Sequence, residues 1–275
     1  MAESSRRSDA PPTTALDRAL SLARDALAAT PAGLLTDFDG TLSPIVGDPT
    51  AAGLVAGADG TLARLAERLA VVAIVTGRAP LDARRMTGVP ELLVAGNHGM
   101  EWLEPGAVEP TAAPETARVR GLLVDLLARV PPIDGVFVEE KGLSAAVHYR
   151  NAAEPDAARD LVLDALGPLP DGLERRHGRM SIELRPTGLG DKGAATRQII
   201  DRFGLLGVVV MGDDMTDLDM FAAVAAARDR GVRGAIIGVG GAHETPAEVI
   251  AAADVLLADP REAAELLALL ASGQP

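Results

Sequence analysis

Two aspartates stand two residues apart at the end of an apolar run, in the segment LLTDFDGTLSPIV (34–46). Asp37 and Asp39 repel each other, so packing alone gives no reason to place two carboxylates at one spot. A carboxylate can attack phosphorus and carry the phosphoryl group as an aspartyl phosphate. A second one on the same side of the extended chain can protonate the leaving alkoxide and then deprotonate the attacking water. The pair therefore predicts phosphoryl transfer, with Asp37 as the nucleophile and Asp39 as the acid and base.

Further polar clusters follow other apolar runs or open a helix. They are Thr76-Gly77-Arg78 and Gly212-Asp213-Asp214, each after an apolar run, and Asp191-Lys192-Gly193 at the start of a helical pattern. Because ligands bind beyond the carboxyl ends of the strands in an open parallel sheet, these clusters are expected to meet. Their composition suits Mg²⁺, which takes oxygen ligands and shares them with a phosphate. Asp213 would complete the metal site, and Thr76 and Lys192 would hold the phosphoryl oxygens.

Glycines and small polar residues in the same loops are candidates for phosphate binding. Gly40 lets the backbone turn close to a phosphate, whose oxygens the loop amides can cradle. Thr41 is the next residue, and Gly77 and Arg78 follow Thr76 in the second loop. We therefore expect Gly40, Thr41, Gly77 and Arg78 to contact the phosphorylated substrate.

Buried parallel strands must position these loops. Runs that are apolar on both faces are typical of such strands, because helices cover a parallel sheet on both sides. The sequence has such runs at 33–37, 70–78, 92–99, 207–214, 234–240 and 255–259. Helical patterns lie at 16–29, 60–70, 80–87, 191–203, 216–227 and 260–271. This alternation predicts the α/β class with a parallel sheet.

The middle of the chain has a different pattern. Helices are expected at 116–130 and 153–166, and hairpins at 135–150 and 173–186, turning near Lys141-Gly142 and Gly178. This order predicts an open antiparallel sheet with helices on one side. We therefore expect a catalytic core of residues 1–110 and 187–275, with an inserted cap, or lid, of α+β type at 111–186.

The composition excludes several classes of function. With a formal net charge of -13, the chain lacks the basic face that nucleic acids and anionic membranes require. The absence of cysteine excludes disulfides, thiolate metal sites and a cysteine nucleophile, and it suits the reducing cytoplasm. Residues 1–14 lack an apolar signal sequence and are expected to form a disordered tail. We expect a cytoplasmic monomer with a small-molecule substrate, and leave an oligomer open.

Together the motifs resemble those of the haloacid dehalogenase superfamily of phosphatases. DxDGT at 37–41, Thr76, Lys192 and GDD at 212–214 follow one another in the order of that superfamily. The resemblance implies a Rossmann-like parallel-sheet core with an inserted cap domain. Other segments resemble the trehalose-6-phosphate phosphatase family, namely GNHGMEW (96–102), VEEKGLSAAVHYR (138–150), ELRPTGLGDKGAA (183–195) and GDDMTDLDMF (212–221). That resemblance implies Mg²⁺-dependent hydrolysis of trehalose 6-phosphate to trehalose and phosphate.

The resemblance also assigns roles to single positions. It implies a metal site of Asp37, Asp213 and the backbone carbonyl of Asp39, with Asp214 and Asp217 as ligands or just outside the ligand set. It implies substrate contacts from Asn97 and His98 at the mouth of the core, and from Glu139, Lys141, Arg150 and Glu183 of the cap. Charged groups suit the cap role because they make strong hydrogen bonds to sugar hydroxyls. The same cap residues could instead form an exposed charged face, and His148 is interpreted as structural.

One position departs from the family pattern. The fourth motif is usually GDDxTDED, and this chain has Leu218 where the family has Glu. Asp217 and Asp219 remain, so the metal site is expected to survive, while the identity of the substrate stays open. The alternatives are a phosphatase of another sugar phosphate or of a pseudo-disaccharide phosphate from an aminocyclitol pathway, a phosphosugar mutase, and a non-catalytic sugar-phosphate sensor.

Overall fold

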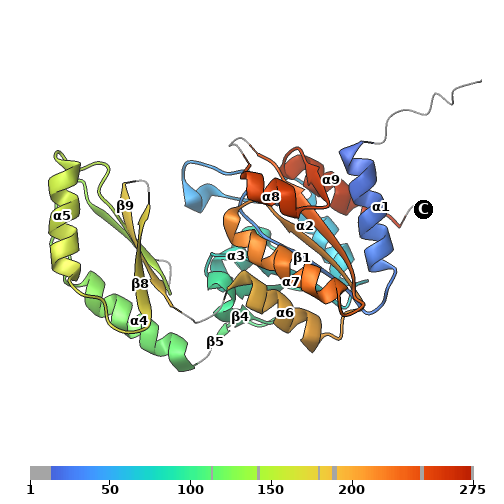
Figure 1. Cartoon of the computed structure of the whole chain (residues 1–275), viewed down its shortest axis with the longest axis horizontal. Coiled ribbons are helices and arrows are strands. Elements are labelled where there is room, and N and C mark those ends of the chain that lie inside the picture. Colours follow the sequence, from blue (N-terminus) through green and yellow to red (C-terminus); the bar gives the residue numbers. More distant parts are fainter. Residues whose placement is uncertain are drawn as a thin grey trace, which may run out of the picture.

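The computed structural model describes residues 14–112, 114–140, 143–178, 180–187, 191–241 and 245–273. Within them the strands form a large sheet and a separate small one (Figure 1). The large sheet has the order β12-β11-β10-β1-β2-β3-β4-β5. Its strands are β1 (Ala32–Thr36), β2 (Val71–Val75), β3 (Leu93–Gly96), β4 (Glu101–Leu103), β5 (Thr111–Ala112), β10 (Gly207–Gly212), β11 (Arg233–Val239) and β12 (Val255–Leu257). They pair in parallel from β12 to β3, and β4 and β5 are added antiparallel.

Apolar residues build the central strands of this sheet. β1, β2 and β10 read AGLLT, VVAIV and GVVVMG, and every residue in them is buried. Alternate residues face opposite sides, so Leu34 packs into one apolar cluster and Leu35 into the other. Both clusters need a cover of helices, because neither sheet face can meet water.

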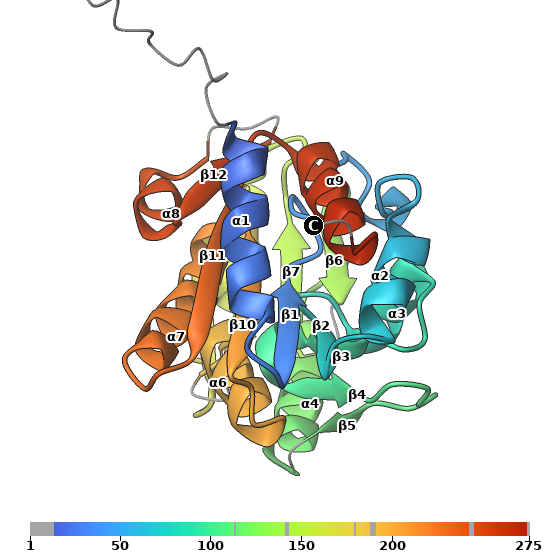
Figure 2. The same ribbon diagram turned by 90° about the vertical axis from the view of Figure 1, so that its right-hand side faces the viewer.

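Helices lie on both faces of the large sheet (Figure 2). The first cluster is covered by α1 (Ala15–Leu27), α2 (Ala58–Ala66), α3 (Pro80–Thr87) and α9 (Pro260–Ala271). The second is covered by α6 (Lys192–Arg202), α7 (Leu218–Arg228) and α8 (Ala247–Ala252). The short 3-10 helices η1 (Pro49–Ala51), η2 (Asn97–Gly99) and η3 (Met215–Asp217) lie in loops that follow strands. The sheet is thus the middle layer of three, and its strand ends carry the loops of interest.

The small sheet has its own apolar core. Its strands β6 (Phe137–Glu140), β7 (Ala145–His148), β8 (Leu173–Gly178) and β9 (Ser181–Pro186) are antiparallel in the order β6-β7-β9-β8. The helices α4 (Pro114–Leu127) and α5 (Pro155–Leu166) pack against one face, with Val119, Val162 and Ile182 among the contacts. Figure 1 shows that this helical layer lies on the side away from the large sheet. The other face of the small sheet is therefore turned toward the strand ends of the large one.

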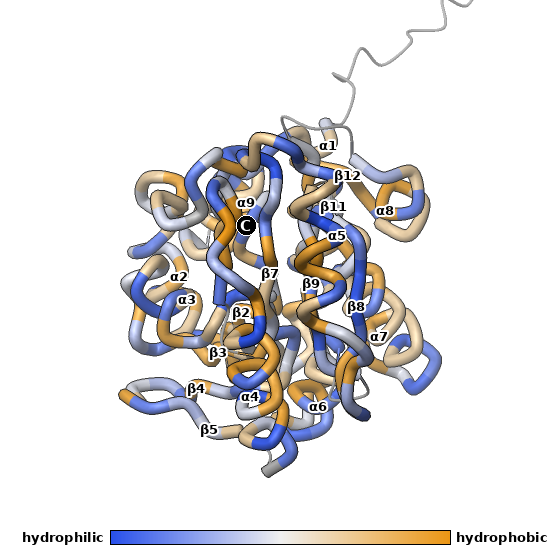
Figure 3. Tube along the Cα trace, turned by 90° about the vertical axis from the view of Figure 1, so that its left-hand side faces the viewer, coloured by the Kyte–Doolittle hydropathy of each residue, from blue (hydrophilic) through white to orange (hydrophobic). Residues whose placement is uncertain are grey.

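One edge of the small sheet, the strand β8, is protected by charge. β8 reads LERRHG and is hydrophilic along most of its length (Figure 3). Arg175 and Arg176 are exposed there. Charged side chains on an edge strand discourage pairing with another chain. Strand addition is therefore disfavoured at this edge.

The expected elements are present, with shifts of a few residues at their ends. The helix expected at 60–70, for example, runs from Ala58 to Ala66, and the one expected at 260–271 has those bounds. Besides short 3-10 turns, three elements were not predicted, namely β4, β5 and α8. They have only 3, 2 and 6 residues, too few for a periodic pattern to stand out. Of the expected tail, residues 1–13 lie outside the described residues, and Thr14 caps α1 through a bond from the Asp17 amide.

We refer to the large sheet and its helices as the core, and to α4, β6, β7, α5, β8 and β9 as the cap. The cap elements lie between β5 and α6 in the chain, although Thr111 and Ala112 still pair with the core strand β4. The division into residues 1–110 with 187–275 and an inserted cap at 111–186 stays our proposal. No helix in the described ranges is both long enough and apolar enough to cross a membrane.

Candidate active site

Asp37 stands directly after β1, at the centre of the large sheet. Its amide donates to the Met211 carbonyl at 3.0 Å, so the parallel pairing of β1 with β10 extends through it. Asp213 follows β10 in the same way, and the neighbouring strand therefore brings it to the same edge. Asp37 is only 6% exposed. The two carboxylates are placed by backbone pairing and not by flexible side chains.

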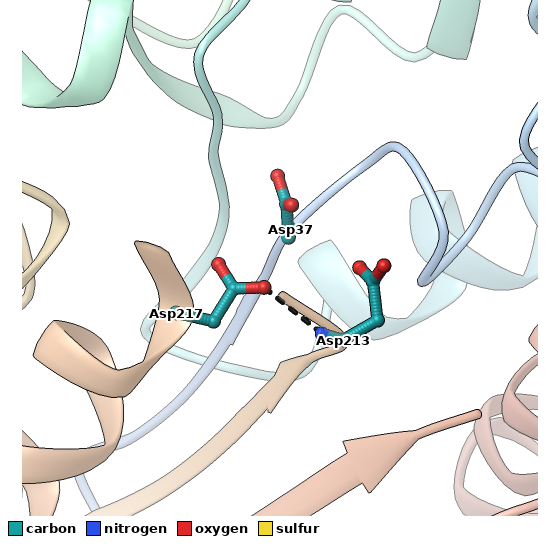
Figure 4. A group of neighbouring side chains, drawn as sticks. All are labelled: Asp37, Asp213 and Asp217. Carbon is teal, nitrogen blue, oxygen red and sulfur yellow. Dashed lines mark hydrogen bonds between the residues drawn. The ribbon is translucent and has the colours of Figure 1, made fainter. Parts of the chain in front are cut away.

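Three carboxylates converge at this edge (Figure 4). Asp37, Asp213 and Asp217 each offer an oxygen, and these oxygens lie within 4.8 Å of one another. Figure 4 shows them reaching toward a common space from the end of β1, from the loop after β10 and from the turn before α7. Hard oxygen donors in such a group are the ligands that Mg²⁺ takes. The donor set fits that metal.

Lys192 is the cation of this cluster. It opens α6, where Asp191 caps the helix by accepting a bond from the Ala194 amide. The Lys192 Nζ lies 2.9 Å from Asp37 Oδ2 and 2.6 Å from Asp217 Oδ1, and the residue is 2% exposed. A lysine in a first helical turn opposes the helix dipole, and the two carboxylates offset that cost. Lys192 therefore joins the nucleophile candidate to Asp217.

Asp217 has a full set of partners, and Asp214 is placed differently. The second oxygen of Asp217 accepts the amides of Asp213 at 2.9 Å and Asp214 at 3.1 Å, and Asp217 is fully buried. Asp214 is exposed and caps η3. Of the two residues that the family resemblance set beside the metal, only Asp217 lies in the carboxylate cluster.

The charges in the cluster do not balance without a metal. Burial raises the pKa of Asp37 to about 8, and Asp217 and Asp213 add to the rise while Lys192 opposes it. Burial likewise raises the pKa of Asp213 to about 7, with Asp217 as the next cause. Burial alone would lower the pKa of Lys192, but Asp37 and Asp217 outweigh it and the pKa is raised. One lysine faces three carboxylates, so a bound divalent cation would stabilise the site.

The turn after Asp39 depends on Gly40. Its φ of 78° is left-handed, and a Cβ there would lie 1.9 Å from Asp213 Oδ2. The next residue, Thr41, donates its hydroxyl to Asp213 Oδ1 at 2.8 Å and is fully buried. Gly40 and Thr41 therefore touch a carboxylate of the cluster, and they hold Asp213 in place.

Gly40→Ala is expected to lower kcat/KM for the substrate by about 10²-fold or more, because the new methyl displaces Asp213. The measurement is phosphate release together with a Mg²⁺ titration, in which the apparent affinity should fall. Gly57→Ala is the matched control. Gly57 has a similar φ of 82° but nothing within 4 Å, so it carries the strain without the collision. Equal activity losses in the two variants would contradict the role given to Gly40.

Asp39 is not among the three clustered carboxylates, and its side chain pairs with Arg78. The guanidinium donates from Nε at 2.6 Å and from its terminal nitrogen at 2.7 Å to the two carboxylate oxygens. The Asp39 side chain is 40% exposed and the Arg78 side chain 17%. Arg78 also lies over the ring of Phe38 at 5.6 Å. The loop after β2 thus reaches Asp39, the candidate acid and base, and Arg78 forms an ion pair with it.

The loop of Thr76 and Gly77 is braced by η2. The His98 amide donates to the Thr76 carbonyl at 2.8 Å, and a Cβ on Gly77 would lie 2.9 Å from the His98 ring. Asn97 and His98 both have left-handed φ values, 49° and 59°. Non-glycine residues hold such strained angles where the surroundings fix them, often at functional sites. Thr76, Gly77 and His98 thus form one packed unit beside Asp39.

A buried carboxylate behind this unit was not predicted from the sequence. Glu101, on β4, is 4% exposed. It accepts a hydrogen bond from the Asn97 amide group on one oxygen and from Arg120 on the other. Arg120 belongs to α4, so the network joins the cap to the loop that braces Thr76. The only sequence signal was that Glu101 is the one acidic residue in the segment GNHGMEW.

Arg120→Ala is expected to lower the free energy of unfolding by about 1 kcal/mol, since it leaves Glu101 buried without its cation while solvent screens the half-exposed arginine. Glu101→Gln removes the charge that needs Arg120. In that background, Arg120→Ala should cost clearly less. Urea unfolding of both single variants and of the double variant measures the coupling. Additive effects would show that the two residues do not interact.

A cavity of about 690 Å³ separates the core from the cap. From the core it is lined by Asp39, Gly77, Arg78 and His98, and from the cap by Glu139, His148 and Glu183. Arg150 is exposed in the turn after β7 and outside this lining as far as the structure describes it. Lys141 lies outside the described residues. The volume is in the range of small-molecule sites.

Comparison with known proteins identifies the family to which the chain belongs. The trehalose-phosphatase family model matches residues 35–249, which is more than half of the chain. The chain belongs to the trehalose-phosphatase family. The matched range begins in β1 and ends in α8, and it includes the carboxylate cluster, Lys192 and the whole cap. The family resemblance seen in the sequence is thereby confirmed.

Relatives and solved structures agree with this family. The trehalose-phosphate phosphatase of Mycobacterium avium (strain 104) is 38% identical over 226 residues, 78% of this chain and 57% of that protein. The chain thus spans little more than half of that relative's length. The C-terminal domain of the Candida albicans trehalose-6-phosphate phosphatase has a TM-score of 0.68 at 22% identity, over 94% of this chain and 98% of its own. A haloacid dehalogenase-like hydrolase from Bacteroides thetaiotaomicron has a TM-score of 0.59 at 15% identity, over 87% and 99%. The expected α/β fold of the haloacid dehalogenase type is confirmed.

Proposed function

We propose that the chain hydrolyses trehalose 6-phosphate to trehalose and phosphate. The observation that carries the proposal is the buried ion-pair cluster of Asp37, Lys192 and Asp217, with Asp213 beside it. A protein that only binds a phosphate gains nothing from three carboxylates aimed at the place where the phosphate would lie. Membership of the trehalose-phosphatase family supports the choice of sugar.

The first proposed step forms an aspartyl phosphate. A carboxylate oxygen of Asp37 attacks phosphorus, and the bond from phosphorus to the sugar oxygen breaks. Asp39 gives its proton to that oxygen, so trehalose leaves as the neutral alcohol. To hold that proton, the Asp39 carboxylate must first part from Arg78 and accept a proton from water, and Arg78 is then free to contact the phosphoryl oxygens. Lys192 and Thr76 stabilise the negative charge on those oxygens.

The second proposed step restores Asp37. Asp39 takes a proton from a water molecule as the water oxygen attacks phosphorus, and the bond from phosphorus to Asp37 breaks. Phosphate leaves, and both aspartates return to their starting forms. Asp37 and Asp213 would hold the Mg²⁺, with the backbone carbonyl of Asp39 as the family resemblance implies. When bound, the ion supplies positive charge to the phosphoryl group.

The cavity between core and cap is proposed to hold the disaccharide. Glu139 and Glu183 of the cap face Asp39 and His98 of the core across it. Carboxylates accept strong hydrogen bonds from sugar hydroxyls. Lys141 and Arg150 stay predictions in this role, as do the cytoplasmic location and the monomeric state.

Leu218, which departs from the family pattern, leaves a second substrate class open. It stands at the start of α7 and packs against the apolar cluster beneath the sheet, so its presence leaves the carboxylates in place. The departure from the family pattern therefore does not argue against catalysis. It leaves the alternative of another sugar phosphate or a pseudo-disaccharide phosphate.

A substrate panel tests the choice of sugar. Phosphate release with Mg²⁺ is measured for trehalose 6-phosphate, sucrose 6-phosphate, glucose 6-phosphate, mannosylglycerate phosphate and p-nitrophenyl phosphate. We expect kcat/KM for trehalose 6-phosphate to exceed that for each of the others by more than about tenfold, since the cavity is proposed to hold both sugar rings between core and cap. Cleavage of p-nitrophenyl phosphate alone would keep the chemistry and overturn the substrate.

A further inference from the structure

One aromatic ring of the cap is left in water. Phe137, on the edge strand β6, is 63% exposed. The chain has only six aromatic residues, 4 Phe, 1 Trp and 1 Tyr, and the other five are buried or half-buried. Burying a phenylalanine side chain stabilises a fold by roughly 1.5–3 kcal/mol. The exposed Phe137 ring therefore contributes little to the stability of the fold, which suggests another use for it.

The strand alternation places this ring on the face turned toward the core. Val138 packs with the cap helices, so its neighbours Phe137 and Glu139 point to the opposite face. That opposite face is the one without helices, and it looks toward the core (Figure 1). Glu139 lines the cavity between core and cap. Phe137 lies two residues along the same strand, roughly 7 Å away at the usual rise of a strand.

The ring of Phe137 is held in place by a neighbour. Phe137 and His148 are partners in the pairing of β6 with β7, and their rings stack with centroids 6.2 Å apart and planes at 25°. His148 is in turn fixed by Glu139, whose Oε2 lies 2.9 Å from the His148 Nε2. Both Glu139 and His148 line the cavity. The three side chains thus form one contiguous group, which we call the aromatic platform, with the exposed Phe137 ring at one end and the Glu139 carboxylate beside His148.

We infer that the aromatic platform binds the sugar ring of the substrate that carries no phosphate. This inference rests on the proposed function and names a contact within it. A pyranose ring has a face of C–H groups and a rim of hydroxyls. An aromatic ring offers the C–H face an apolar surface with a negative quadrupole, and Glu139 accepts hydrogen bonds from the rim.

The position of the platform selects which ring it contacts. The phosphate must lie at Asp37 in the core, so the phosphorylated ring lies near the mouth formed by Asp39 and His98. The platform belongs to the cap: its Glu139 and His148 line the other wall of the cavity, and Phe137 adjoins them on the same face of the cap sheet. It would therefore meet the second ring, which a monosaccharide phosphate lacks. The aromatic platform is then a determinant of specificity for disaccharide phosphates.

A competing use of Phe137 is an apolar contact between cap and core. Ile45 and Val46 of the core are 53% and 41% exposed and line the same cavity. A cap that closed by pressing Phe137 against them would need apolar bulk, and it would assist every substrate alike. The two uses therefore differ in their dependence on the second sugar ring.

The test compares Phe137→Ala and Phe137→Leu with Leu161→Ala. Leu161 is 54% exposed on α5, which covers the opposite face of the cap sheet, so it is a matched loss of surface apolar area. Phe137→Ala is expected to raise KM for trehalose 6-phosphate about tenfold with kcat little changed. Phe137→Leu should behave similarly, because leucine keeps apolar bulk but has no flat face. KM for glucose 6-phosphate and the activity of Leu161→Ala should stay within twofold of the unchanged chain.

Calorimetry of trehalose binding measures the affinity of the platform for the sugar independently of catalysis. The unchanged chain should bind trehalose more tightly than Phe137→Ala by about tenfold. Equal trehalose binding by the two chains would overturn the inference, and so would full activity in Phe137→Leu or an equal rise of KM for mono- and disaccharide phosphates. A failure of the unchanged chain to release phosphate from trehalose 6-phosphate would instead contradict the proposed function.

Discussion

Asp37→Asn is expected to reduce phosphate release from trehalose 6-phosphate by more than about 10⁴-fold, because the nucleophile of the first step is lost. The folded structure should persist. Burial raises the pKa of Asp37 from 3.8 to about 8, so the metal-free fold loses stability as the pH rises through this range, because the carboxyl ionises in the unfolded chain before it does in the folded one. Asparagine removes that charge. In EDTA at pH 7, the melting temperature of the variant should therefore equal or exceed that of the unchanged chain.

The control for this variant is Asp59→Asn, at an exposed position in the first turn of α2. It removes one carboxylate from the surface and should leave turnover unchanged. Steady-state phosphate release and thermal melting are measured for all three proteins. Substantial turnover by Asp37→Asn, above a tenth of the normal rate, would exclude the covalent mechanism.

Lys192→Met should have the largest effect on stability. The lysine is 2% exposed and contacts Asp37 and Asp217, so its removal leaves a buried carboxylate cluster with no cation. Breaking a buried ion pair in this way costs about 3–5 kcal/mol. Activity should fall by about 10²-fold or more as well, since a donor to the phosphoryl oxygens is lost. Urea unfolding in EDTA measures the first effect and phosphate release the second.

Two further measurements separate charge from packing at Lys192. Mg²⁺ should stabilise Lys192→Met more than it stabilises the unchanged chain, because the ion supplies the missing positive charge. Asp217→Asn added to Lys192→Met should recover part of the lost free energy of unfolding. If neither Mg²⁺ nor Asp217→Asn restored stability, the loss would come from packing and the electrostatic interpretation would fail.

The central residues of the site could be predicted from the sequence. Asp37, Thr76, Asp213 and Lys192 each follow an apolar strand or open a helix, and the end of a parallel sheet brings such positions together. Their mutual placement follows from strand order, which is a property of the fold class. The pairing of β1 with β10 and β2 therefore supplies what the motif order had implied.

The pairing of side chains within the site could not be predicted from the sequence. Asp214 and Asp217 look alike in GDDMTDLDMF, and only the turn before α7 turns Asp217 inward to Lys192 and leaves Asp214 in water. The ion pair of Arg78 with Asp39 was not predicted, and the contact of Arg78 with a phosphate stays a prediction. Glu101 and Arg120 are distant in sequence and carry no shared motif. Such contacts depend on tertiary packing, which local patterns do not record.

The most direct test of the proposed chemistry is phosphate release from trehalose 6-phosphate by the purified chain, with Mg²⁺, with EDTA, and with Mg²⁺ restored. We predict rapid release with Mg²⁺, loss of activity in EDTA and full recovery on addition of the metal. Mg²⁺ binding without phosphate release from trehalose 6-phosphate, or from any other ester in the panel, would contradict a catalytic role for the Asp37 cluster and would favour a sugar-phosphate sensor.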